Sequence, residues 1–441
     1  MKKILLGFAA LAAVILIYMT TSGSVQATEA LKTKVHQQVS TLQKNGFSID
    51  EKKIEEKKEH YVLTISEPKK IAKYLAAQGM QVEKEELAAL KGAKLAMDIS
   101  YLKDTYSVLS ADIYPLTLPD SVLNEAKPED KKIIAQFQKM LDEKALLIHV
   151  DFNKMLSGFK GYMKDLNQTF EDEEKVTLVI QGMTFKGDIE KERVNHIRQE
   201  VAILSVITDD NFKVTAKKMR SDYALTGSGI YDVHSAYEAD EITLLIKDAD
   251  PVSIKGFKST IENNVSNGLA ESSIHSNIDT LSFTQMKLPY TFDAVDFSFN
   301  IKNLDVAAFE ALQETDDDNT TEIQRLTQEI LSKGIEMQIP NFSVRALTQD
   351  KKQLGGFTLN SSLKIAKDLD LQAVVNNPFA MLNAVDAHTK LVISKELFTL
   401  ISKDPRAMIM TMMIPRVEEN GKTVYTIELK NGKFTVNGTS F

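Results

Sequence analysis

The 441-residue sequence contains no cysteine. Disulfide bonds, cysteine-ligated metals, iron–sulfur clusters and thiol nucleophiles are therefore excluded. The chain also lacks an excess of positive charge, since 53 lysines and arginines against 61 aspartates and glutamates leave a formal charge of −8. Nucleic-acid binding requires clustered basic side chains, and the lysine-rich stretch from Glu51 to Glu59 contains interleaved glutamates. We predict no nucleic-acid partner.

The familiar histidine-based metal motifs are also missing. No histidine occurs in a His-Glu-x-x-His spacing or in a pair with ligand geometry. The seven histidines are His36, His60, His149, His196, His234, His275 and His388. A zinc site assembled from distant histidines is the less favoured alternative to surface or hydrogen-bonded histidines.

Two further stretches resemble ligand-binding motifs without completing them. Asp316-Asp317-Asp318-Asn319 offers oxygen atoms, but Thr321 and Thr327 stand where a calcium loop needs glycine and glutamate. Thr226-Gly227-Ser228-Gly229 lacks the lysine of a phosphate loop. No Gly-x-Ser-x-Gly turn occurs. We therefore predict no catalytic, cofactor-binding or metal-binding residue and no cofactor, and we favour a non-enzymatic protein over an enzyme.

The N-terminus carries an export signal. Lys2 and Lys3 precede an uncharged run from Ile4 to Met19, as in a secretory segment whose lysines stay cytoplasmic. The run is short for a membrane span, although Thr20 to Ser24 are uncharged and would complete it. Val25-Gln26-Ala27 places small residues where a signal peptidase cleaves. Residues 1–27 are thus either a signal anchor or a signal peptide.

The next stretch predicts alternating helices and strands. Leu31, Val35, Val39 and Leu42 form one apolar stripe of a helix that ends at Asn45-Gly46. Period-two and helical spacing then predict a strand at Tyr61–Ile65, a helix opened by Pro68 and a strand at Tyr106–Ile113. A linker follows at Leu116–Pro128. Two further helices are predicted, one with Ile134, Phe137 and Leu141, and one with Met155, Phe159, Met163 and Leu166 that Gly158 and Gly161 weaken.

From Val176 onward the pattern is mainly period two, which predicts antiparallel, half-exposed strands. The predicted strands are Val176–Ile180, Glu200–Ile207, Phe212–Ala216, Glu241–Ile246 and Phe292–Ile301. A helix at Ile323–Leu331 stops at Gly334 and begins with a capping box of Asn319 and Glu322. The chain ends in a hairpin, in which Tyr425 to Leu429 and Phe434 to Val436 flank a turn at Asn431-Gly432.

We predict an α+β fold, in which a curved antiparallel sheet-rich body cradles amphipathic helices behind an N-terminal membrane helix. The predicted regions are the signal segment 1–27, an N-terminal α+β region 28–118, a central β-rich region 119–290 and a C-terminal α+β region 291–441. Met408–Ile414 is the most apolar internal run. It reads as a buried strand, or as an adaptable surface that faces a lipid or a partner.

The order of elements in the last third resembles the YdgA-like family of bacterial envelope proteins, a family of unknown function. The likeness rests on Phe297–Ile301, Asn303-Leu304-Asp305, the helix Ile323–Leu331, Ile335–Val344, Gly355–Asn360, Asp386–Ile393 and Leu429–Gly438. The resemblance implies a Gram-negative protein on the periplasmic side of the inner membrane, anchored by its N-terminal helix. The alternative is a soluble periplasmic protein cleaved near Ala27. The family provides no catalytic residues to transfer.

These observations lead us to expect a non-enzymatic cell-envelope protein that binds an apolar ligand, such as a lipid, or an envelope protein through its sheet surface. Two alternatives stay open at this stage. One is a hydrolase whose site is assembled from dispersed residues, and the other is a structural tether that associates with itself as a homo-oligomer.

Overall fold

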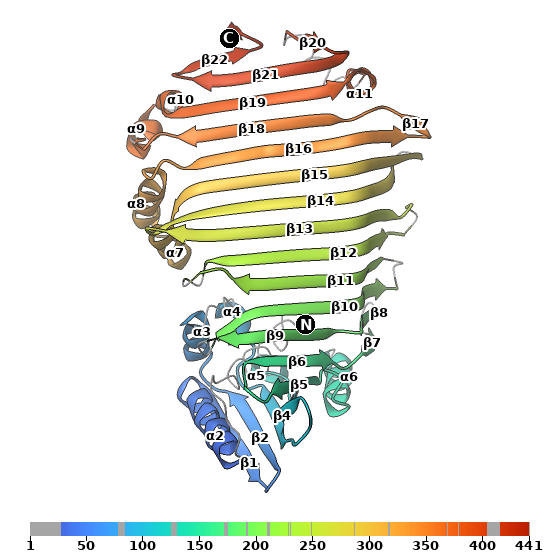
Figure 1. The fold of residues 1–441 in the computed structure, drawn as a ribbon, viewed down its shortest axis with the longest axis vertical. Coiled ribbons are helices and arrows are strands. Elements are labelled where there is room, and N and C mark those ends of the chain that lie inside the picture. Colours follow the sequence, from blue (N-terminus) through green and yellow to red (C-terminus); the bar gives the residue numbers. More distant parts are fainter. Residues whose placement is uncertain are drawn as a thin grey trace. The chain divides into compact units, whose positions relative to one another are not determined.

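The computed structural model describes residues 28–77, 84–124, 130–171, 175–190, 193–209, 212–227, 229, 231–247, 249–285, 287–315, 318–367, 369–377, 379–403 and 415–440. Two compact units divide between Leu225 and Thr226. Each unit combines antiparallel sheet with helices (Figure 1). The division into regions 28–118, 119–290 and 291–441 stays a prediction. Within these ranges no helix is long and apolar enough to cross a membrane. The predicted segment Ile4–Met19 lies outside them.

The first unit contains five helices and eleven strands among its described residues. They are α2 (Thr28–Lys44), β1 (Phe47–Ile54), β2 (Lys58–Ile65), α3 (Pro68–Ala77), α4 (Lys84–Ala89), β3 (Lys94–Tyr101), β4 (Ser107–Pro115), α5 (Asp120–Asn124), α6 (Lys131–Asp142), β5 (Ile148–Asn153), β6 (Gly158–Met163), β7 (Leu166–Glu171), β8 (Lys175–Gln181), β9 (Thr184–Glu190), β10 (Arg193–Thr208) and β11 (Lys213–Leu225).

These strands pair in the order β1-β2-β3-β4-β5-β6-β9-β10-β11, and every pair is antiparallel. The 16-residue strand β10 pairs with β9 through its first half and with β8 through its second half. Strand β7 then pairs with β8. One long strand therefore joins the two parts of this sheet.

The apolar stripe of α2 is buried against the sheet, as predicted. Leu31, Val35, Val39 and Leu42 are each at most 5% exposed and share one buried cluster with side chains of β2 to β5. The predicted strand at Tyr61–Ile65, the helix that Pro68 opens and the helix with Ile134, Phe137 and Leu141 are also confirmed as β2, α3 and α6. Burial of one face stabilises each of these elements.

The predicted helix with Met155, Phe159, Met163 and Leu166 is wrong, because the structure forms the strands β6 and β7 there. The helical spacing of these four residues is coincidental. Gly161 instead permits close packing within the sheet, since a Cβ atom at this position would lie 2.5 Å from the ring of Phe185. Gly161, which would weaken a helix, thus leaves room for the aromatic side chain of Phe185 on the neighbouring strand.

The predicted linker at Leu116–Pro128 is wrong as far as Asn124, where the described residues end. Leu118 is 1% exposed and belongs to a buried cluster with Phe137 and Leu141 of α6. Asp120 begins the short helix α5. Pro115 is the last residue of strand β4, and the chain from there to Asn124 remains part of the first unit.

The second unit is formed by twelve strands and five helices in the part of the chain that the structure describes. They are β12 (Val233–Leu245), β13 (Val252–Ser266), β14 (Leu269–Gln285), β15 (Leu288–Asp305), α7 (Val306–Glu314), α8 (Thr320–Leu331), β16 (Glu336–Gln349), β17 (Lys352–Gln353), β18 (Phe357–Ile365), α9 (Leu371–Asn376), α10 (Ala380–Ala384), β19 (Val385–Ser394), α11 (Lys395–Ile401), β20 (Val417–Glu419), β21 (Lys422–Lys430), β22 (Lys433–Val436) and β23 (Thr439–Ser440).

The long strands of this unit pair in the order β12-β13-β14-β15-β16-β18-β19-β21-β22-β23, again antiparallel throughout. The order follows the chain, with helices inserted between β15 and β16, between β18 and β19, and between β19 and β21. Four hairpin turns of this unit are Asn-Gly pairs with positive φ at both residues: Asn267-Gly268, Asn420-Gly421, Asn431-Gly432 and Asn437-Gly438. The predicted terminal hairpin is confirmed as β21 and β22.

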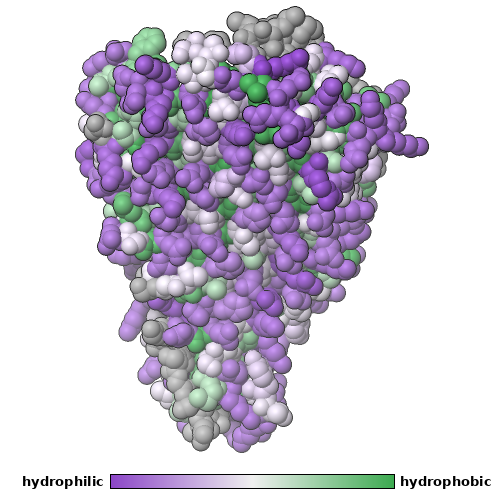
Figure 2. Space-filling model, turned by 45° about the horizontal axis from the view of Figure 1, so that its top comes forward, coloured by the Kyte–Doolittle hydropathy of each residue, from purple (hydrophilic) through white to green (hydrophobic). Residues whose placement is uncertain are grey.

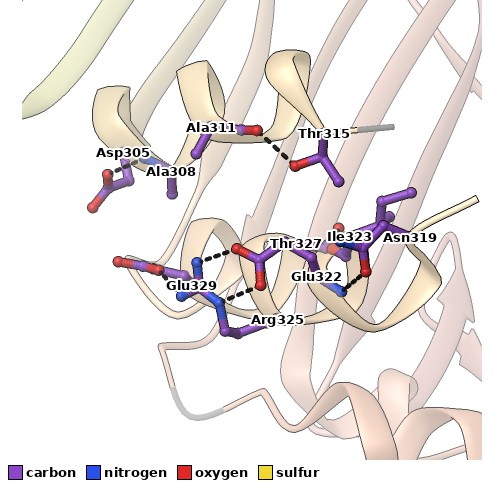
Figure 3. A network of polar contacts seen from close by, with 10 residues as sticks. All are labelled: Asp305, Ala308, Ala311, Thr315, Asn319, Glu322, Ile323, Arg325, Thr327 and Glu329. Carbon is purple, nitrogen blue, oxygen red and sulfur yellow. Dashed lines mark hydrogen bonds and ion pairs between the residues drawn. The ribbon is translucent and has the colours of Figure 1, made fainter. Parts of the chain in front are cut away.

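Two helices pack together at one end of these strands (Figure 3). Asp305 caps α7 by accepting a hydrogen bond of 3.0 Å from the backbone N–H of Ala308. Asn319 caps α8 by accepting from the N–H of Glu322, as the capping box predicts. The Glu322 carboxylate does not return to Asn319 but pairs with Arg325, which also contacts Glu329.

The Asp305 cap predicts an acid-sensitive contribution to stability. The N–H of Ala308, helped by Lys333 at 3.2 Å, holds the pKa of Asp305 below its usual value of about 4. The resulting stabilisation is present above that value and is lost as the pH falls through the lower pKa of the folded state. We expect Asp305→Ala to lower the free energy of unfolding by about 1 kcal/mol at pH 7. Urea unfolding at pH 7 and at pH 3 measures this, and an equal loss at both pH values would contradict it.

Candidate functional site

An apolar strip crosses the middle of the sheet in the second unit. Directly paired residues place Phe297 opposite Phe342, and Phe342 opposite Leu359. One row further along the same face, Phe299 pairs with Ile274. We define the apolar strip as Ile274, Val295, Phe297, Phe299, Phe342 and Leu359. Residues two apart on a strand share a face, so all six side chains lie on one side of the sheet.

Aromatic rings extend this strip toward one end of the strands. The ring of Phe297 meets that of Phe342 edge-on, with 5.9 Å between centroids, and Phe342 meets Phe357 edge-on at 5.1 Å. Phe357 packs against a buried cluster formed by α11, β19 and β21, which includes Ile393, Phe398 and Tyr425. The strip is therefore continuous with a packed core at this end.

A second buried cluster bounds the strip at the opposite end of the strands. It contains Leu326 and Ile330 of α8, Ala308 of α7 and Ile365 of β18, and Ile301 of β15 packs against it. Figure 1 shows α7, α8, α9 and α10 together at this end. Helices thus cover the two ends of the apolar face.

The strip itself belongs to neither cluster, and its side chains are half-buried. All sixteen residues of β15 from Tyr290 to Asp305 have this intermediate exposure. A strand covered on one face shows a different pattern, as in β9, where exposed and buried residues alternate. Val344, which pairs with Val295 on this face, is 4% exposed, but the six side chains of the strip are not sealed as in a closed core.

The opposite face of the same strands is polar. Asn341 donates a hydrogen bond to Asp296, and His388 Nδ1 lies 3.2 Å from the Glu428 carboxylate. A shallow pocket of about 520 Å³ on this face is lined by charged and amide side chains, among them Glu336, Lys364 and Asp386. The sheet is therefore amphipathic. Figure 2 accordingly shows a surface on which hydrophilic residues predominate and hydrophobic residues form separate patches.

Each of the seven histidines lies within 3.6 Å of a carboxylate oxygen. The pairs are His36–Glu59, His60–Asp98, His149–Asp112, His196–Asp222, His234–Glu262, His275–Asp296 and His388–Glu428. Most of them join neighbouring strands, so their role is cross-strand pairing. No group of three or more potential metal ligands occurs in the described part of the chain.

The first unit contains a buried carboxylate that no sequence motif indicated. The side chain of Glu59 is fully buried and accepts hydrogen bonds from the hydroxyls of Tyr61 at 2.7 Å and Tyr101 at 2.8 Å. His36 Nε2 of α2 lies 3.0 Å from the same carboxylate. The sequence around Glu59 does not indicate this burial, because its lysine-rich surroundings resemble a solvated surface.

Burial, reinforced by the Glu59 carboxylate, raises the pKa of both tyrosine hydroxyls far above the usual value. They remain protonated donors at any physiological pH. Both rings are buried, and the cluster connects α2 to the sheet through His36.

The other stretches that resemble ligand motifs have structural roles or lie outside the described residues. Asn319 caps α8, while Asp316 and Asp317 are outside the description. Near the glycine-rich stretch at 226–229, Asp232 accepts hydrogen bonds from the N–H groups of Gly229 and Val265. The apolar run Met408–Ile414 lies wholly outside the described residues, so its prediction stays open.

A comparison with protein families places this architecture in a bacterial group. A family described as bacterial protein of unknown function (DUF945) matches residues 127–441. The chain belongs to the DUF945 family. No curated protein matches the sequence. The apolar strip lies inside the DUF945 region, whereas the Glu59 cluster precedes it. The narrower likeness to YdgA-like proteins stays a prediction.

Proposed function

We propose that this DUF945 protein is non-enzymatic and binds the acyl chain of a lipid along the apolar strip. The half-buried row of Phe297, Phe342 and Leu359 between two packed clusters supports the proposal. An extended acyl chain fits such a row because it needs apolar contact and no hydrogen bonds. Burial of about eight methylenes would contribute roughly 6 kcal/mol before the loss of translational freedom is subtracted.

The proposal includes a location in the cell envelope. If the predicted segment Ile4–Met19 anchors the chain, the two units stand on the periplasmic side of the inner membrane. A soluble periplasmic form cleaved near Ala27 is the alternative. Either location gives access to phospholipids. An envelope protein or a second copy of the chain is the competing occupant of the same face.

Photocrosslinking tests the proposal. Host cells that produce the full chain are fed a fatty acid with a diazirine group and illuminated, and crosslinked peptides are mapped by mass spectrometry. We expect adducts on β15, β16 and β18. Leu359→Glu should lower the adduct yield about tenfold or more, because a buried carboxylate opposes an apolar ligand.

Thr358→Glu is the matched control. Thr358 neighbours Leu359 on β18 but faces the polar side, opposite Ser343. The same charge added there should leave the adduct yield close to that of the unchanged chain. Equal yields for both variants, or adducts only outside the second unit, would overturn lipid binding on the strip. Protein–protein crosslinks through the strip would favour the competing occupant.

A further inference from the structure

The connection between β18 and β19 exposes large apolar side chains in the short helices α9 and α10. Val375 is 67% exposed, Phe379 74%, Met381 45% and Leu382 38%. We call these four residues the apolar tip. Single exposed hydrophobic residues are common, but four within eight positions form a patch that is associated with binding.

The backbone of the tip is held in place, so the exposure is not due to a loose end. Asp370 caps α9 by accepting hydrogen bonds from the N–H groups of Gln372 and Ala373. The Gln328 side chain of α8 bridges Leu369 and Leu371 on either side of this cap. The inner face of α9 also packs against the helical cluster through Val374. Adjacent Val375 consequently points outward.

The tip is also free of charge. No aspartate, glutamate, lysine or arginine occurs from Leu371 to Val385. Its polar residues are amides, which enter the headgroup region of a membrane far more readily than charged groups do. Behind the tip, a groove of about 700 Å³ between α8 and α9 is lined by Lys367, Arg325 and Asp370, and Arg325 pairs with Glu322 and Glu329. The tip therefore presents apolar and amide side chains without charge.

From this arrangement we infer that the apolar tip inserts into the surface of a phospholipid bilayer. A stable protein interface uses about 20 to 30 residues a side. Four side chains on two short helices are too few for that, but they suffice for shallow insertion into a membrane. The inference rests on the proposed function in one respect, namely that insertion gives the strip a source of lipid. The tip adjoins the helical cluster at one end of the strip.

The absence of tryptophan from the chain permits a local test. Phe379→Trp places a single fluorophore on the tip of the full chain, which is reconstituted into vesicles of phosphatidylethanolamine and phosphatidylglycerol. We expect a blue-shifted emission, and quenching by brominated phosphatidylglycerol at least about twofold stronger than for a control tryptophan. Phe212→Trp is that control, since Phe212 is 38% exposed in the connection before β11. This local signal does not depend on whether the N-terminal segment is itself in the bilayer.

Equal quenching at both positions would overturn the inference. A blue shift without quenching would also overturn it, because it would show that protein covers the tip. A second variant separates this inference from the proposed function. Phe379→Ser should lower the rate of lipid transfer from vesicles to the protein about tenfold, because one apolar anchor is lost. Photocrosslinking of a free fatty acid to β15, β16 and β18 should stay unchanged. Loss of both signals would assign Phe379 to the strip rather than to a membrane contact.

Discussion

Deletion of Thr423–Phe441 is expected to destabilise the second unit severely. Val424, Tyr425 and Val436 are each at most 8% exposed, and Tyr425 and Val436 share a buried cluster with α11. Burial of three such side chains contributes roughly 5 to 9 kcal/mol, against a total stability of about 5 to 15 kcal/mol. The deletion also removes the partners of β19 residues Ala387 to Ile393. Differential scanning calorimetry of the full chain should show one transition lowered by roughly 10 to 20 °C or lost.

A shorter deletion provides the control. Removal of Gly438–Phe441 takes away Thr439 and Ser440, which are exposed. It retains Asn437, whose side chain accepts from the N–H of Thr426 and donates to the carbonyl of Val424. We expect a change of about 0.5 kcal/mol or less. If the two deletions melt at the same temperature, the hairpin is not an integral part of the unit.

Glu59→Ala is expected to have the largest effect of any single substitution proposed for the first unit. The change leaves the buried hydroxyls of Tyr61 and Tyr101 without their acceptor and opens a cavity between α2 and the sheet. Each unsatisfied buried donor costs about 1 to 3 kcal/mol, so the free energy of unfolding should fall by about 3 to 5 kcal/mol. Urea denaturation of the full chain, followed by circular dichroism, measures this.

Matched variants identify the cause. Glu56→Ala removes a carboxylate from an exposed position three residues away and should be nearly neutral. In a Glu59→Leu background, Tyr61→Phe and Tyr101→Phe should recover stability, because they remove the unpaired donors. If Glu59→Ala lowers the free energy of unfolding no more than Glu56→Ala does, the role assigned to the buried carboxylate is contradicted.

The same cluster predicts a loss of stability in alkaline solution. Burial and the Glu59 carboxylate raise the pKa of both tyrosines in the folded state. Their stabilisation is fully present below about pH 10, the usual tyrosine value, and is lost as the pH rises beyond it. The loss should be smaller when both tyrosines are replaced by phenylalanine.

Local patterns predicted many elements correctly because their cause is local. The stripe of Leu31, Val35, Val39 and Leu42 fixes α2, Asn319 fixes the start of α8, and Asn431-Gly432 fixes the terminal turn. An Asn-Gly turn requires only positive φ at two adjacent residues, so distant contacts do not alter it. Period two likewise predicted the antiparallel sheet of the second unit.

Predictions failed where distant residues decide the structure. Met155, Phe159 and Leu166 have helical spacing, yet Gly161 meets Phe185 of β9 across the sheet. Leu118 lies between Pro115 and Pro119 in a stretch that resembles a linker, yet it packs against α6. Glu59 lies in a lysine-rich stretch. Its burial is favourable only because the hydroxyls of Tyr61 and Tyr101 and the imidazole of His36 contact its carboxylate.

By itself the sequence determined the absence of thiol chemistry, the acidic surface and the antiparallel texture, since these depend on composition and on neighbouring residues. Only the tertiary structure decided that Phe297, Phe342 and Leu359 lie in one row and that no described layer seals them. Alternation assigns a residue to one of two faces of its strand. Whether that face is covered depends on where helices from other parts of the chain pack, and here the described helices cover the ends of the strands.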